Sequence, residues 1–329
     1  MWGCILIDLH CHLDGSITVD IAKELAAVQN IELPAKTDEE LLKKLSIPDD
    51  CESLNDFLTC FGLPLRLLQT KEGITQAVYL VQEMFRKQGL IYLELRFAPQ
   101  LHCVNGLTQE EVIVAALEGL KKSELHTNLI LCLMRSDHNQ AENLETIEFA
   151  KKYLVKDEGV VAVDLAGAEG LFKTKDFESP FSLARKYNIP FTIHAGEADG
   201  PESVKSALEF GAFRIGHGVR IAEDDELVDF IAAKNIPLEM CPNSNRQTKA
   251  VDDMSKYPLR KFLEKGIKVT INTDDPAICR TNIKNEFDYI KKMYGITKTE
   301  EKALLLNAVD SAFCSNEYKQ KMNEIIINS

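Results

Sequence analysis

The stretch PFTIHAGEADGPESVKSALEFGAFRIGHG, residues 190–218, contains one complete unit of the pattern that decides the fold. Two short apolar runs, PFTIHA and FRIGHG, flank a segment with helical spacing that ends at Gly211, just before the second run. Glycine at that place is typical of a helix C-terminus that leads back into a strand. The stretch therefore predicts a strand, a helix and a second strand.

The same pattern recurs along the rest of the chain. Further runs rich in β-branched residues are ILIDL, LIYLELRF, LILCLM, VVAVDLA, IPLEMC and IKVTINT, so that eight strands are expected in all. Gly89, Gly159 and Gly266 also end helical segments, and Thr108 and Glu111 have the spacing of a capping box. Near-continuous apolar strands joined by helices indicate a covered parallel sheet, and eight such units close a (β/α)₈ barrel. The predicted fold class is therefore α/β, a single TIM barrel.

Residues 16–89, which follow the first strand, are too many for one crossover and contain several helical patterns. We expect them to form a helical insertion over the barrel mouth. No Pro/Gly/Ser-rich linker or low-complexity tract divides the chain, and residues 1–329 are therefore predicted to form one domain.

Composition excludes several classes of protein. The 329 residues are 45% hydrophobic and 27% charged, as in ordinary globular proteins, and the net charge is −13. Such a charge repels phosphate backbones and anionic membranes, so neither nucleic acid nor a membrane is an expected partner. No basic leader precedes the first apolar run, and we expect a cytoplasmic protein. Nine cysteines without a C-x-x-C pair are interpreted as small buried side chains.

Histidines and acids gather at the ends of the expected strands. His10 and His12 lie two residues apart in the first strand and point to one face, which suits either half of a metal site or a pair of structural histidines. Four more strand-end groups favour the metal site, because TIM barrels build their active sites at strand carboxyl ends; they are His194, Glu197, His217 and the pair Asp274–Asp275. His102, His126 and His138 have no such placement and are given no role.

Imidazole and carboxylate ligands with a place left open for water are typical of catalytic zinc. The predicted ligands are His10, His12, His194 and Asp274, which hold one Zn²⁺ per chain. Such an ion lowers the pKa of water from about 15.7 to about 7, and this chemistry indicates a hydrolase.

Six motifs, HCHLDGS, DLAG, HAGE, IGHG, CPNSN and NTDDP, follow one another in an order that resembles the adenosine deaminase family of metal-dependent amidohydrolases. YLELRFAPQLH and FLTCFGLPLRLLQT add to the likeness, which runs through nearly the whole chain. The resemblance implies a cytoplasmic enzyme of purine salvage. It would hydrolyse adenosine and 2′-deoxyadenosine to inosine and 2′-deoxyinosine and release ammonia.

The resemblance also implies a role for each catalytic residue. Water activated by the metal attacks C6 of the purine, while His217 orients it, accepts its proton or stabilises its charge. Glu197 then protonates the ring nitrogen N1, which requires a protonated carboxyl, and a desolvated pocket favours that form by raising the pKa. Asp275 would hydrogen-bond N7, with the shared proton on either partner.

The remaining implied substrate contacts are the Gly167 backbone with N3, Asp14 with the ribose 5′-hydroxyl, and His12 beside the substrate. Relatives that act on the free base tend to have glutamate where this chain has Asp14, so aspartate favours the nucleoside. The family often has LAGDE where this chain has LAGAEG, and Ala168 in place of an acid leaves the local sugar contacts open.

Two groups of residues keep two interpretations each. Leu54, Phe57, Leu58 and Phe61 have helical spacing and match the apolar gate of the family, but they also suit the packing face of an ordinary helix. Glu239 is either a carboxylate that supports a metal ligand or a structural residue. Ser244 and Asn245 are expected to shape the loop after the seventh strand.

Three alternatives remain at this point. The first two are a deaminase of adenine and a deaminase of a modified aminopurine, both of which would need the same metal site. The third is an inactive barrel that serves as a binding protein. Zinc deaminases of nucleic-acid bases are excluded, because their H-x-E and P-C-x-x-C signature is missing. We expect a purine nucleoside as the small-molecule partner and a monomer.

Overall fold

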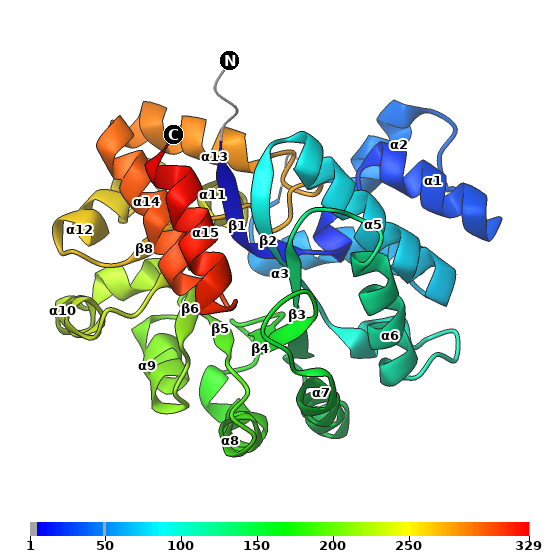
Figure 1. Cartoon of the computed structure of the whole chain (residues 1–329), viewed down its shortest axis with the longest axis horizontal. Helices are drawn as coiled ribbons and strands as arrows, with labels where there is room; N and C mark the ends of the chain where they lie inside the picture. The colour runs from blue at the N-terminus through cyan, green and yellow to red at the C-terminus, as the bar shows by residue number, and fades with distance from the viewer. Residues whose placement is uncertain (1–4, 49–50, 329) are drawn as a thin grey trace.

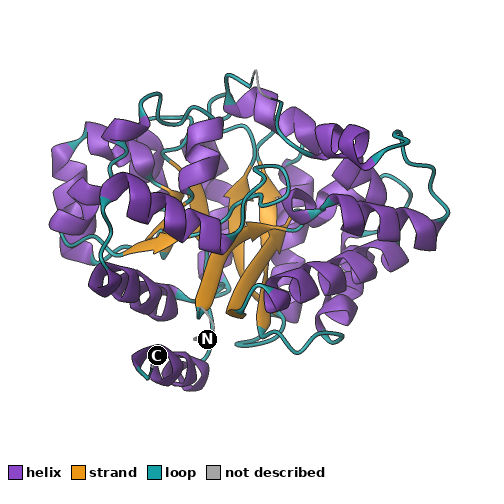
Figure 2. Ribbon diagram, turned by 90° about the horizontal axis from the view of Figure 1, so that it is seen from above, coloured by secondary structure: helices purple, strands orange, loops and turns teal. Residues whose placement is uncertain are grey.

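Eight parallel strands stand at the centre of the molecule, and helices surround them (Figures 1 and 2). The computed structural model describes residues 5–48 and 51–328, so Cys4 lies outside the described residues. All eight expected strands are present, and they are β1 Leu6–His12, β2 Leu90–Phe97, β3 Thr127–Met134, β4 Val160–Ala166, β5 Thr192–Ala195, β6 Arg214–His217, β7 Leu238–Met240 and β8 Val269–Ile271.

The strands pair in sequence order within two four-stranded sheets, β1 to β4 and β5 to β8. Parallel bridges link the sheets at both seams. Val163 pairs with Phe191 between β4 and β5, and Cys11 pairs with Asp274 between β1 and the end of β8. At the second seam the His12 amide donates to the Asp274 carbonyl at 2.8 Å. This α/β arrangement confirms the predicted TIM-barrel class.

Five helices fill the predicted insertion between β1 and β2, and they are α1 Val19–Gln29, α2 Asp38–Leu45, α3 Leu54–Leu58, α4 Gly62–Leu67 and α5 Lys71–Lys87. The helices between later strands are α6 Gln109–Leu120, α7 Gln140–Tyr153, α8 Glu178–Lys186, α9 Pro201–Glu209, α10 Asp225–Lys234, α11 Pro242–Gln247 and α12 Leu259–Glu264. Three more follow β8, namely α13 Ile283–Tyr294, α14 Lys298–Ser311 and α15 Asn316–Ile327. None of the helices in the described ranges is both long and apolar enough to cross a bilayer.

Local sequence signals are confirmed at most helix ends. The capping box of Thr108 and Glu111 opens α6, and Gly89, Gly211 and Gly266 have positive φ angles of 92°, 90° and 74°. The expectation for Gly159 is wrong. Helix α7 ends earlier, at Tyr153, and a Cβ on Gly159 would lie 2.6 Å from a methyl carbon of Val155. Close packing against Val155, rather than a helix C-cap, therefore favours glycine at this position.

Charged side chains occupy the middle of the barrel. Arg96 and Arg214 are fully buried, and both contact Glu239 on β7. Arg96 also binds Asp164 on β4 at 2.9 Å, and Arg214 binds Glu94 on β2. Buried charges are tolerated only when they are paired, and this network pairs every one of these groups. It lies directly beneath the histidines of the strand ends.

Candidate active site

The strand-end histidines and Asp274 converge on one point. His10 Nε2 lies 3.0 Å from His194 Nε2 and 3.1 Å from Asp274 Oδ1. His12 Nε2 lies 3.2 Å from His194 Nε2 and 3.3 Å from the same Asp274 oxygen. Residues from β1, β5 and the end of β8 thus share a centre, although more than 260 positions separate the first from the last in the chain.

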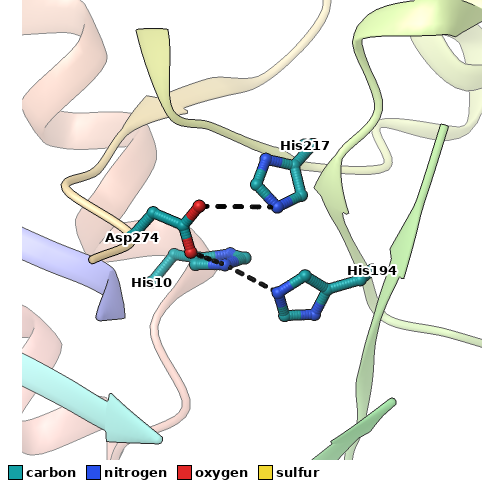
Figure 3. Close-up of side chains that lie close together, drawn as sticks. All are labelled: His10, His194, His217 and Asp274. Carbon is teal, nitrogen blue, oxygen red and sulfur yellow. Dashed lines mark hydrogen bonds and ion pairs between the residues drawn. The ribbon is translucent and has the colours of Figure 1, made fainter. Parts of the chain in front are cut away.

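In a slightly different group, the ligand atoms all lie within 4.8 Å of one another. This group consists of His10, His194, His217 and Asp274 (Figure 3). His217 Nε2 lies 3.9 Å from Asp274 Oδ2, the oxygen that faces away from His10. His217 and Asp274 both adopt left-handed backbone angles, with φ of 60° and 64°. Left-handed angles are uncommon for residues other than glycine, and strained backbone of this kind is often found at functional sites.

Buried carboxylates lie beside the far nitrogens of two of these histidines. His10 Nδ1 lies 2.7 Å from Glu239 Oε2, and His194 Nδ1 lies 2.8 Å from Asp164 Oδ2. Arg96 binds both carboxylates and so ties the two supports together. Glu239 is therefore a support of His10, one of its two interpretations. Asp164 and Arg96 had no predicted role, although a charge inside the apolar strands VVAVDLA and LIYLELRF was the available signal.

The donor set fits a divalent cation. His10 Nε2 and His194 Nε2 face each other across 3.0 Å, and both would turn lone pairs to that point if each ring were neutral with its proton on Nδ1, beside Glu239 and Asp164. A tetrahedral ion with bonds of about 2.0–2.1 Å holds neighbouring ligand atoms about 3.3 Å apart, close to the spacing observed here. A shared cation would remove the repulsion between these lone pairs and balance the Asp274 charge.

Glu197 and His217 face each other beside this centre. Glu197 Oε2 lies 3.6 Å from His217 Nε2, and Glu197 Oε1 accepts a hydrogen bond from Thr248 at 3.0 Å. Burial, and then the charges of Asp274 and Glu169, raise the pKa of Glu197 to about 8. This shift favours the protonated form of the carboxyl at neutral pH.

Asn245 determines which nitrogen of His217 carries the proton. The Tyr257 hydroxyl donates to Asn245 Oδ1, so the Asn245 amide nitrogen faces His217 Nδ1 at 3.0 Å and donates to it. Burial lowers the pKa of His217 well below its usual range, which keeps the ring neutral. A neutral ring that accepts at Nδ1 has its proton on Nε2, the atom that faces Glu197 and Asp274.

Asp14 and Asp275 each have a buried side-chain oxygen with no partner. One carboxylate oxygen of each side chain, Oδ1, is buried and makes no hydrogen bond. Burial, and then the charges of Asp274 and Asp14, raise the pKa of Asp275 well above its usual range. Unpaired buried polar atoms are costly, and they are expected where a ligand completes them.

These groups line a cavity of about 280 Å³, close to the lower limit of typical small-molecule sites. Every predicted catalytic and substrate-binding residue lines it, and its wall also contains Ala168 and the expected gate residues Leu54, Phe57, Leu58 and Phe61. Phe57 is also buried against Ile278, so the gate stripe is both a packing face and a cavity wall. The cavity-lining residues that the structure describes do not include His102, His126 or His138.

Comparisons with known proteins agree with this geometry. The adenosine deaminase family model matches residues 6–329. An adenosine deaminase of Haemophilus ducreyi is 49% identical over 96% of this chain and 94% of its own length, and one of Clostridium perfringens is 39% identical over 98% and 97%.

Solved structures with the same fold include an adenine deaminase from Arthrobacter aurescens, with a TM-score of 0.89, 27% identity and 98% coverage of both chains. The N6-methyl-AMP deaminase of Arabidopsis thaliana has a TM-score of 0.84 at 25% identity and covers 99% of this chain and 97% of its own. Together with the donor set of this site, the family match and the relatives establish that the chain belongs to the adenosine deaminase family.

Proposed function

We propose that the chain is a zinc-dependent hydrolase that converts adenosine and 2′-deoxyadenosine to inosine and 2′-deoxyinosine and releases ammonia. One observation carries the proposal: a His/Asp centre suited to a metal adjoins the cavity that Glu197 lines, and burial and neighbouring charges raise the pKa of Glu197 to about 8. Relatives named adenosine deaminase, one of them 49% identical over nearly the full length, support the choice of substrate.

His10, His12, His194 and Asp274 are the proposed zinc ligands, with one ion per chain. The His10 and His12 Nε2 atoms each lie 3.0–3.3 Å from His194 Nε2 and from Asp274 Oδ1, and this spacing supports the set. His217 is left outside it, since its Nε2 faces the other oxygen of Asp274 at 3.9 Å. A bound zinc ion would lower the pKa of water to about 7 and so supply a nucleophile at neutral pH.

Glu197 is the proposed acid that protonates N1 of the purine as the nucleophile adds at C6. Its neutral carboxyl and its position beside His217 support this role. For His217, a proton on Nε2 favours stabilising the negative charge of the nucleophile over accepting its proton, because that nitrogen has no free lone pair.

Asp275, Gly167 and Asp14 are the proposed contacts for N7, N3 and the ribose 5′-hydroxyl. The raised pKa of Asp275 supports a protonated carboxyl that donates to N7. Gly167 has a φ of +103° in the cavity wall, where its backbone can approach a flat ring closely. His12 lines the same cavity and would lie against the substrate as well as the metal.

Two related substrates are less well supported. A free base would leave the unpaired oxygen of Asp14 without a partner, although a solved neighbour is an adenine deaminase. A nucleotide would need a phosphate site, and the single cation in the described cavity lining, Arg135, already donates to the carbonyls of Phe172 and His194. The monomeric state and the cytoplasmic location stay predictions from the sequence.

The proposal is tested by following inosine and ammonia from adenosine, deoxyadenosine, adenine and adenosine monophosphate. Glu197→Gln keeps the shape of the side chain but loses the acid, so metal content should be unchanged while turnover falls roughly 10²- to 10⁴-fold. Glu202→Gln, the same change on an exposed residue of α9, is the matched control. Faster turnover of adenine than of adenosine, or an active Glu197→Gln, would contradict the assignment.

A further inference from the structure

A single buried carboxylate binds the whole turn that carries Glu197. Glu169 lies in the loop after β4, and its Oε1 accepts from the Gly196 amide at 2.7 Å. Its Oε2 accepts from the amides of Glu197, Ala198 and Asp199 at 3.0, 2.7 and 3.0 Å. Four consecutive backbone donors thus depend on one side chain, which is 1% exposed.

The same carboxylate is held from behind by a chain of hydroxyl groups. Ser203 Oγ donates to Glu169 Oε1, and Thr174 Oγ1 lies 2.6 Å from Ser203 Oγ. Arg135 donates to Thr174 Oγ1 at 2.9 Å and to the His194 carbonyl at 2.6 Å. The network therefore hydrogen-bonds to the end of β5 at two places, the His194 carbonyl and the backbone amides of the residues that follow.

Within residues 5–48 and 51–328, no other side chain hydrogen-bonds to any of these four amides, and the Glu197 carboxyl has one hydrogen-bond partner of its own, Thr248. The position of the Glu197 carboxyl therefore depends on where the 196–199 turn holds its backbone. A displacement near 1 Å at a reacting group can lower a rate about 10²-fold.

We propose that Glu169 is a positioning residue, which holds the 196–199 turn so that the Glu197 carboxyl is directed at the purine ring. The inference rests on the proposed function, in which Glu197 is the acid. The substrate contacts proposed for Asp14, Gly167 and Asp275 lie on other segments, so loss of the Glu169 bonds should slow the chemical step and leave binding nearly unchanged.

Glu169→Gln tests this role directly. A glutamine side chain has one acceptor, its carbonyl oxygen, and one donor, its NH₂ group. The NH₂ group cannot accept a hydrogen bond, so the backbone N–H groups that face it lose their acceptor. We expect kcat for adenosine to fall roughly 10- to 100-fold, with KM within about threefold and metal content unchanged. Hydrogen exchange measured on peptides spanning residues 195–200 should become faster, and this readout needs no activity.

Two further variants define the mechanism. Glu169→Asp keeps the charge but shortens the reach by one methylene, so it should rescue part of the loss in kcat. Ser203→Ala removes one of the five hydrogen bonds to the carboxylate and leaves all four amides paired, so kcat should stay within about threefold of the parent.

The outcomes separate cleanly. Unchanged kcat in Glu169→Gln, or a loss that matches an equal loss of folded protein or bound metal in both Glu169 variants, would overturn the proposal. If the parent chain fails to deaminate adenosine, the proposed function is wrong. Faster hydrogen exchange confined to residues 196–199 in Glu169→Gln would still show that Glu169 holds this turn. Protection that is unchanged in the glutamine variant would refute the grip itself.

Discussion

Replacement of Gly15 by alanine should disturb the active site without touching any group that reacts. A Cβ at this position would lie 1.7 Å from Asp275 Oδ1, 2.5 Å from its Cγ and 2.7 Å from its Cβ. All three atoms are too close, so rotation of the carboxylate alone does not relieve the contact. Gly15 cannot easily retreat either, because its carbonyl accepts from the Ala277 amide at 2.9 Å.

The size of the effect follows from this geometry. Ordinary contact needs about 3.5 Å, so the Asp275 carboxylate must move by roughly 2 Å from the place proposed for N7 recognition. A misplacement of that order corresponds to about a 10²-fold loss of kcat/KM, or about 2.7 kcal/mol of transition-state stabilisation. We expect much of the loss to appear as a higher KM for adenosine.

The assay is initial-rate ammonia release over a range of adenosine concentrations, together with thermal unfolding of each variant. Gly62→Ala is the matched control, because a Cβ there meets nothing within 4 Å and α4 already has helical angles at this residue. That control should keep the parent kinetics and gain up to about 1 kcal/mol of stability. Parent-like kcat/KM in a folded Gly15→Ala would refute the reasoning.

Other predictions concern pH, metal and the cavity wall. Burial raises the pKa of Glu286 from 4.5 to about 7. The folded chain thus holds this proton more tightly than the unfolded chain. About 3 kcal/mol of stability should therefore be lost as pH rises from 4.5 through 7. In urea denaturation, the stability of Glu286→Gln relative to the parent should therefore rise between pH 5 and pH 8, whereas a constant difference would contradict the shift. A chelator should abolish deamination and added Zn²⁺ restore it, as measured by metal analysis and rates on the same sample; full activity without metal would exclude a metal role. Phe57→Ala should lose about 3–5 kcal/mol of unfolding free energy because the ring is fully buried, whereas half-buried Leu58→Ala should chiefly raise KM.

Short-range patterns account for what could be predicted. Each strand lies in a short, largely apolar run, and the order of strands and helices leaves few topologies other than the barrel. In that fold all strand carboxyl ends meet at one rim, so a histidine or an aspartate at the end of a strand is placed near the others by topology alone. For this reason His10, His12, His194 and Asp274 could be grouped from the sequence before any distance was known.

Other features depend on contacts between distant segments. The sequence does not indicate that Glu169 crosses from one loop to the four amides of the next, or that Arg96 joins Glu239 to Asp164. Gly159 was assigned to a helix end that lies elsewhere, because its need for glycine arises from packing against Val155.

The sequence by itself determined the fold class, the chemistry of the donor atoms and the rim at which they meet, since periodicity and residue type are local properties. Only the tertiary structure decided which carboxylate supports which histidine, which nitrogen of His217 carries the proton and which backbone donors Glu169 satisfies. These depend on separations of a few ångströms between segments far apart in the chain, and burial then decides the charge of Glu197 and Asp275.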